Sequence, residues 1–186
     1  MRSIWSGILF VSMMTAGTAF ADFLPNEVNL CSNGGCTQKM TEIQNAFASG
    51  TEFNPLLAGP TAAYSGSCYY MMSSIDPNHE NHGGFVLWRD EDDVMHFNGV
   101  FHFFAKSDPY EGMTGGEMFK LIRSKSTTPH PVREETTMGH VIIASETANL
   151  HYWMRTNSDG SEMYLLSQWI FKAGPSNSSF CRLKRH

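Results

Sequence analysis

The sequence predicts a mainly β protein, with an antiparallel sheet of about six to eight strands and one or two short helices packed on it. Beyond Gly59-Pro60, stretches rich in aromatic and β-branched residues alternate with short polar turns. In several stretches apolar side chains recur at every second position, which is the period of a strand with one buried face. Only two stretches show helical spacing, so the helical part is expected to be small.

Seven segments have the composition of strands. They lie at about 62–73, 84–89, 94–104, 137–145, 148–156, 162–172 and 178–184. Asp90 to Asp93 form an acidic turn, and Asn157 to Ser161 form a hairpin loop whose glycine suits a positive φ. Asn98-Gly99 is also a turn sequence, but we expect one strand with a bend there.

Side-chain parity predicts which strands are covered. In the segment 94–104, Phe97 and Phe101 lie on an apolar face, while His96 and His102 lie on a polar face that we expect to be wet. The segment 162–172 is apolar on both faces. It therefore belongs in the middle of the sheet, with a helix covering its second face.

Two segments are predicted to be helical. The first, at 37–49, has Thr37 as its N-cap. The second, at 115–124, begins with a capping box formed by Thr114 and Glu117. The apolar positions of the two helices are Met40, Ile43, Ala46, Phe47, Met118, Leu121 and Ile122. Each helix can therefore bury one side against the sheet.

Residues 1–21 have the pattern of an export signal. Arg2 precedes an apolar stretch, and Ala19-Phe20-Ala21 predicts cleavage after Ala21. The apolar stretch is too short to cross a bilayer, and no later segment is long and apolar enough. We expect residues 22–186 to be one domain, periplasmic or extracellular, with a helical segment at 22–59 and a β part at 60–186.

Four cysteines follow the predicted cleavage site and indicate disulfide bonds in an oxidising compartment. Three pairings are available to them. We favour Cys31 with Cys36, because local pairs close most easily, and then Cys68 with Cys181. The second bond would join the first strand to the last, as closure of a barrel requires. The alternative, in which Cys31 and Cys36 are bonded to Cys68 and Cys181, stays open.

The sheet is expected to close into a barrel or to fold into a sandwich. Such a barrel is similar in architecture to lipocalin and avidin barrels, although Tyr64 to Cys68 stands where lipocalins carry Gly-x-Trp, and no family is assigned. Tyr64, Phe97, Phe101 and Trp169 would line a pocket for a small apolar or aromatic ligand. The competing interpretation is that the aromatic residues fill a core.

The polar segment 76–84 is the densest group of ligand-type residues. Asp76, His79, Glu80 and His82 could form a hydrolytic or metal site, whereas the simpler interpretation is a polar connection that faces water. His96 and His102, on one strand about 20 Å apart, are too distant to share a metal ion. We predict no cofactor, with a metal ion at residues 76–82 as the alternative.

The charge balance and the missing motifs limit the function classes. A net charge of −5 argues against binding of nucleic acid through a basic surface. No serine-nucleophile or zinc-helix motif is present in the sequence. We therefore predict an exported, non-catalytic protein that binds a small apolar or aromatic ligand. The alternatives are an exported hydrolase with its site at residues 76–82, and an envelope structural or interaction protein. The sequence leaves the oligomeric state open.

Overall fold

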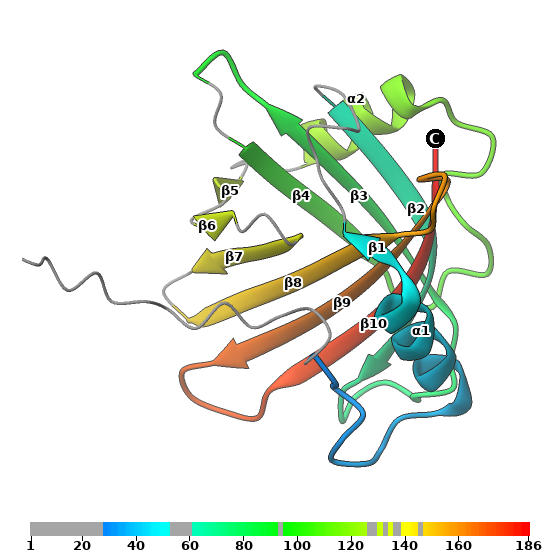
Figure 1. Cartoon of the computed structure of the whole chain (residues 1–186), viewed down its shortest axis with the longest axis vertical. Helices are drawn as coiled ribbons and strands as arrows, with labels where there is room; N and C mark the ends of the chain where they lie inside the picture. Colours follow the sequence, from blue (N-terminus) through cyan, green and yellow to red (C-terminus); the bar gives the residue numbers. More distant parts are fainter. Residues whose placement is uncertain are drawn as a thin grey trace, which may run out of the picture.

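The computed structural model describes residues 28–52, 61–92, 95–125, 130–131, 134–135, 139–144 and 147–186. The protein is mainly β, as predicted: an antiparallel sheet curls into a half-barrel with two short helices on its outer surface (Figure 1). Within the described ranges, no helix has the length and hydropathy needed to cross a bilayer. The predicted export signal lies outside these residues.

In the described residues, seven longer strands and three two-residue strands build the sheet. The longer ones are β2 (Thr61–Met71), β3 (Asn81–Arg89), β4 (Met95–His102), β7 (His140–Ala144), β8 (Ala148–Thr156), β9 (Glu162–Phe171) and β10 (Asn177–Arg185). The short ones are β1 (Thr51–Glu52), β5 (His130–Pro131) and β6 (Glu134–Glu135). Their order across the sheet is β5-β4-β3-β2-β10-β9-β8-β7-β6, and β1 pairs with β8.

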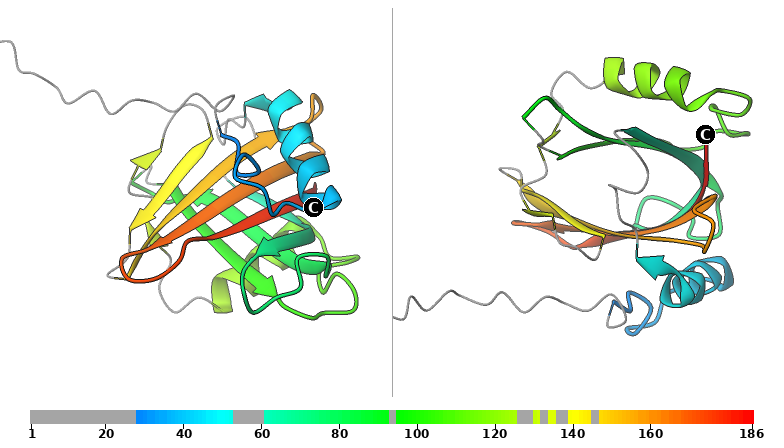
Figure 2. Two further views of the ribbon diagram at one scale, coloured as in Figure 1. Left: turned by 90° about the horizontal axis from the view of Figure 1, so that it is seen from below. Right: turned by 45° about the horizontal axis from the view of Figure 1, so that its top comes forward.

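The first and last long strands, β2 and β10, are neighbours in the middle of the sheet. The two ends of the sheet, β5 and β6, are two residues apart in sequence. Covalent geometry keeps the Cα atoms of Pro131 and Glu134 within about 11 Å of each other. The sheet therefore curls until its ends approach, as Figure 2 shows.

Aromatic side chains meet across the concave face of the sheet. The ring of Phe97 on β4 lies 4.7 Å from that of Tyr152 on β8, and Phe101 on β4 lies 5.6 Å from Trp169 on β9, centroid to centroid. Strands from opposite sides of the half-barrel thus touch through these side chains. The rest of this core contains Ala62, Tyr64, Cys68, Tyr70, Ile75, Phe85, Leu87, Val141, Ile143, Met154, Met163, Leu165, Cys181 and Leu183.

Helix α1 (Gln38–Ser49) covers the convex face on the side of β8, β9 and β10. It begins where the Thr37 side chain accepts a hydrogen bond from a backbone N–H of the first turn, as predicted. Phe47 on this helix packs in one cluster with Leu166 of β9 and Phe180 of β10. This contact explains why β9 is apolar on both faces.

Helix α2 (Gly115–Lys125) lies on the opposite outer side, over β2 and β3 (Figure 2). The predicted capping box is present, because Thr114 N–H donates to the Glu117 carboxylate and Glu117 N–H donates to the Thr114 hydroxyl. Met118 and Ile122 are fully buried beneath the helix. The two helices therefore leave a strip of the convex face between them uncovered.

Both predicted disulfides, Cys31–Cys36 and Cys68–Cys181, are present. Cys68 and Cys181 stand directly opposite each other in the β2–β10 pair, and both are fully buried. This bond ties the first long strand to the last one. Disulfide bonds are typical of proteins from oxidising compartments.

Two local predictions differ from the structure. Strand β3 begins at Asn81 rather than at 84, because Gly83 and Gly84 allow close packing: a Cβ on Gly83 would lie 2.9 Å from the Cys68 sulfur, and one on Gly84 would overlap the Tyr110 ring. The outer face of β4 is also less wet than expected. Asn98 is buried under α2 and donates to the Ile122 carbonyl over 3.2 Å.

Candidate functional site

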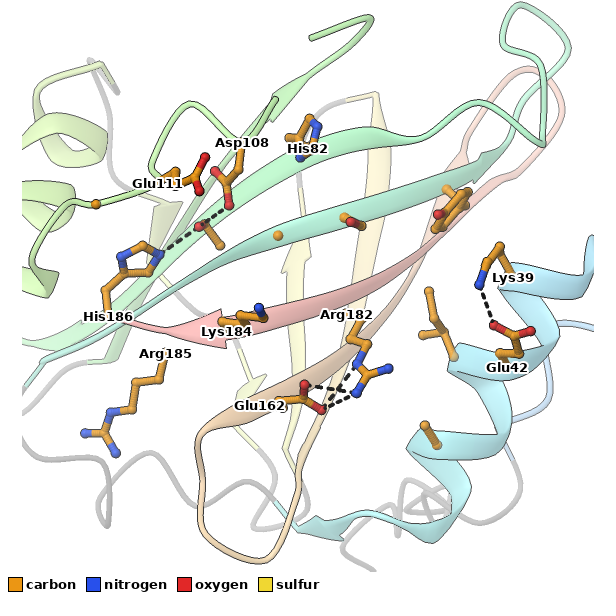
Figure 3. Close-up of a pocket in the computed structure, with 17 residues that line it drawn as sticks. Lys39, Glu42, His82, Asp108, Glu111, Glu162, Arg182, Lys184, Arg185 and His186 are labelled. Carbon is orange, nitrogen blue, oxygen red and sulfur yellow. Dashed lines mark hydrogen bonds and ion pairs between the residues drawn. The ribbon is translucent and has the colours of Figure 1, made fainter. Parts of the chain in front are cut away.

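A polar groove of about 780 Å³ runs along the uncovered strip of the convex face (Figure 3). Its floor is formed by outward-facing residues of β2 and β10, among them Ser65, Ser67 and Lys184. Helix α1 forms one wall, and the segment 108–112 before α2 forms the other together with His82 of β3. A volume of this size is typical of sites for small molecules.

The groove is hollow because β2 carries small residues between the two helices. In the middle of this strand the outward-facing residues are Ala63, Ser65, Ser67 and Tyr69; Ala63 packs in the α2 cluster and Tyr69 in the α1 cluster. The small side chains of Ser65 and Ser67, which lie between Ala63 and Tyr69, leave space above the strand. Gly66 brings β2 close to β10, since a Cβ at this position would overlap the Arg182 carbonyl oxygen.

One end of the floor holds a hydrogen-bonded chain of side chains. The Ser65 hydroxyl, only 1% exposed as a residue, donates to Asp108 Oδ2 over 2.7 Å and lies 2.7 Å from His186 Nε2. His186 Nδ1 lies 2.8 Å from the Met113 carbonyl oxygen, to which it donates. Ser65 therefore links Asp108 to His186 at this end of the groove.

The order of groups differs from that of a Ser-His-Asp catalytic triad. In a triad the carboxylate binds the histidine, and the serine gives its proton to that histidine. Here Asp108 binds the hydroxyl of Ser65, while the second nitrogen of His186 binds a backbone carbonyl. The chain therefore anchors the 108–112 segment and His186 to the floor of the groove.

Further charges in the groove are paired. Arg182 on β10 forms a two-pronged ion pair with Glu162 on β9, with its shortest N–O distance at 2.8 Å. Lys39 and Glu42 pair on α1 at 3.0 Å. Hydrogen bonds, the largest from Lys39, lower the pKa of Glu42. These four side chains satisfy one another and line the α1 side of the groove.

Three lining side chains have no such partner. Lys184 and Glu111 are exposed, and neither side chain forms a hydrogen bond or ion pair with the described part of the chain. Figure 3 shows Lys184 on β10 and Glu111 beside Asp108, on opposite sides of the β2 strand. His82 is only 9% exposed, and its buried Nδ1 has no hydrogen-bond partner among those residues.

His102 on β4 lies directly across from His82 in the β3–β4 pair. Its Nε2 is 2.8 Å from the hydroxyl of Tyr110, which is buried. Burial is the largest cause that lowers the pKa of His102, and burial raises the pKa of Tyr110 to about 12. The neutral forms are therefore favoured, and the tautomer of His102 decides which of the two groups donates.

The side chains predicted as a site in the 76–84 segment have separate partners. Asp76 accepts a backbone N–H in its own turn, and the His79 ring contacts the Phe104 ring at 5.3 Å. Glu80 accepts hydrogen bonds from side chains of β2, and only His82 lines the groove. In the regions covered by the structure, no three His, Cys, Asp or Glu side chains are arranged to hold a metal ion.

The four residues predicted to line a ligand pocket all belong to the concave side. Phe101 and Trp169 are in direct ring contact, and Phe97 packs against the ring of Tyr152. Tyr64 is fully buried and its hydroxyl donates to the Gly160 carbonyl in the β8–β9 hairpin. Gly160 lies just before the start of β9, whereas Trp169 lies near the end of this strand. Tyr64 and Trp169 therefore lie near opposite ends of β9.

Sequence reasoning missed most residues of the groove. Ser65 and His186 are 121 positions apart, and Asp108 lies on a connecting segment with no motif around it. The only usable signal is the small-residue run Ser65-Gly66-Ser67 inside a strand. No family model, curated protein or solved structure matches the chain. The function must therefore be argued from the groove.

Proposed function

We propose that this chain is an exported binding protein that holds a small polar molecule in the groove between α1 and the 108–112 segment. The observation that carries the proposal is the groove itself: about 780 Å³, lined by two exposed charges and by His82, whose buried Nδ1 has no partner among the described residues. Burying a polar atom without a partner costs about 1–3 kcal/mol, and a bound polar ligand can remove part of that cost.

Export is proposed from two features that point the same way. Two disulfides are typical of oxidising compartments. Residues 1–21 match the pattern of a cleaved signal. A periplasmic or extracellular protein of this kind would meet its ligand outside the cytoplasm.

Binding is favoured over catalysis because of the chain at Ser65. Its hydroxyl proton points to Asp108, and the residue is almost fully buried, so the oxygen is poorly placed to attack a substrate. In the alternative hydrolase site, at residues 76–82, Asp76 binds a backbone N–H of its own turn, Glu80 binds the Ser67 hydroxyl, and the His79 ring contacts the Phe104 ring. Both observations support a binding role.

The experiment is a thermal-shift screen of the exported protein against a library of small polar metabolites, repeated on two variants. Ser67→Phe fills the floor of the groove, while Ser158→Phe places the same side chain on an exposed hairpin. We expect ligands that stabilise the wild type and Ser158→Phe but not Ser67→Phe. Polar ligands that stabilise all three proteins equally would refute the groove as the site.

A second candidate function is the binding of an apolar or aromatic molecule on the concave side, as the sequence predicts. Tyr70 favours it, because its hydroxyl is buried without a hydrogen-bond partner in the described structure, next to the Phe101 ring at 5.5 Å. A ligand with one polar group would satisfy that hydroxyl. Aromatic hits lost in Tyr70→Phe but kept in Ser67→Phe are the expected result for this site; hits unaffected by Tyr70→Phe would contradict it.

A further inference from the structure

The groove carries equal numbers of fixed opposite charges. Its lining contains four basic side chains, Lys39, Arg182, Lys184 and Arg185, and four acidic ones, Glu42, Asp108, Glu111 and Glu162. A site built for a simple anion or cation would have an excess of the opposite sign, which attracts and holds that ion. A balanced lining favours a ligand that carries both signs.

Most of these charges already have partners inside the groove. Arg182 pairs with Glu162, Lys39 with Glu42, and Asp108 accepts from Ser65. Lys184 and Glu111 are the lining charges that keep their full capacity to bind a ligand, since their side chains have no partner among the described residues. One is a cation and the other an anion.

The two unpaired charges stand on different elements. Lys184 lies on β10, whereas Glu111 lies on the segment that packs over β3 and β4 through Tyr110. Strand β2 separates β10 from β3, so two strand spacings, about 10 Å, lie between these backbones. About three residues of extended chain cover that length. A single amino acid, whose ammonium and carboxylate groups are bonded to the same carbon atom, is too short.

The surface between the two charges suits a peptide. The Ser67 hydroxyl oxygen and the imidazole of His82 line the floor and one wall, where peptide amide groups could bind them. Ile43 and Ala46 of α1 form an apolar part of the other wall. That part would contact small uncharged side chains.

Resting on the proposed function, we infer that the groove binds a zwitterionic peptide of about two to four residues, with its carboxylate on Lys184 and its ammonium group on Glu111. Both charges are exposed, so each ion pair between a peptide terminus and one of these side chains contributes modestly to the affinity. We expect roughly a fivefold loss of affinity for each terminus that is neutralised. The groove thereby discriminates free short peptides from blocked peptides and from single ions.

The test is isothermal titration calorimetry of the exported protein with a matched series: trialanine, N-acetyl-trialanine, trialanine amide and the doubly blocked peptide. The variants are Lys184→Met and Glu111→Gln, and the controls are Lys172→Met and Glu91→Gln, exposed residues outside the groove lining. We expect trialanine to bind most tightly. Amidation should cost affinity in the wild type and the controls but not in Lys184→Met, and acetylation should cost affinity except in Glu111→Gln.

The outcomes separate this inference from the proposed function. Equal affinity for free and blocked peptides, or no detectable binding of trialanine, overturns the peptide inference; polar ligands that are lost in Ser67→Phe would still support the groove as a binding site. Losses on amidation and acetylation that persist in both groove variants also overturn it. Trialanine binding that Ser67→Phe leaves unchanged contradicts both proposals.

Discussion

Removing the Cys68–Cys181 disulfide should lower the free energy of unfolding by about 5 kcal/mol. The bond joins residues 113 positions apart. In the chain-entropy description, closing a loop of that length takes about 16 cal/mol/K from the unfolded chain, which is about 5 kcal/mol at 25 °C. Both cysteines are fully buried at the β2–β10 pair, so replacement by alanine also removes packing. The loss is a large part of the stability of an ordinary domain.

The matched control is removal of the second disulfide, Cys31–Cys36, whose residues are 5 positions apart. The same relation gives about 2 kcal/mol for this short loop. We would measure urea unfolding of the Cys68→Ala/Cys181→Ala and Cys31→Ala/Cys36→Ala proteins by circular dichroism. Equal losses in the two variants would refute the assignment of Cys68–Cys181 as the bond that holds the sheet together.

Three further predictions concern the surroundings of the groove. Ser65→Ala should cost about 1–3 kcal/mol in urea unfolding, because it leaves the Asp108 carboxyl group and the His186 ring without their shared partner, and a loss no larger than that of Ser67→Ala would contradict this role. The lowered pKa of His102 means that the unfolded chain binds more protons as the pH falls through about 6.5. Stability should therefore decline below that pH, less steeply in His102→Gln; identical slopes for the two proteins would argue against it. Gly84→Ala should destabilise the fold by about 1–3 kcal/mol, because the new methyl group meets a buried ring, whereas Gly116→Ala, with open space around it in α2, should be neutral or stabilising. A tolerated Gly84→Ala in thermal unfolding would show that this strand is packed less tightly than described.

Short-range sequence signals predicted the two helix starts and the covered strand β9. The reciprocal hydrogen bonds of Thr114 and Glu117 start α2, and the Thr37 hydroxyl starts α1. Parity identified β9 as a covered central strand, because Leu166 packs outward while Leu165 packs inward. These signals lie within a few residues of each other, so spacing alone reveals them.

The start of β3 could not be predicted in the same way. Asn81, His82, Gly83 and Gly84 have low strand propensity, and the two glycines resemble a turn. They are in the strand because the Cys68 sulfur and the Tyr110 ring occupy the space of their missing side chains. Both neighbours come from elsewhere in the chain, and tertiary contacts of this kind have no local signature.

The groove was equally inaccessible to sequence reasoning. It exists because two helices cover the ends of β2 and leave Ser65 and Ser67 between them. Lys184 and Glu111 are ordinary surface residues in the sequence. They become candidates only once their neighbours are seen to be paired. The predicted site at 76–82 shared with the groove only His82, which β3 turns outward.

The most direct measurement is a two-dimensional ¹H–¹⁵N NMR titration of the exported protein with trialanine, with backbone amides assigned. Binding in the groove predicts shifts concentrated in residues 65–67, 108–112 and 182–186, which form its floor and one wall. Shifts confined to the concave side, around Phe101 and Trp169, would contradict the groove as the ligand site and favour the aromatic interior. No shifts in any of these segments at millimolar peptide would contradict peptide binding.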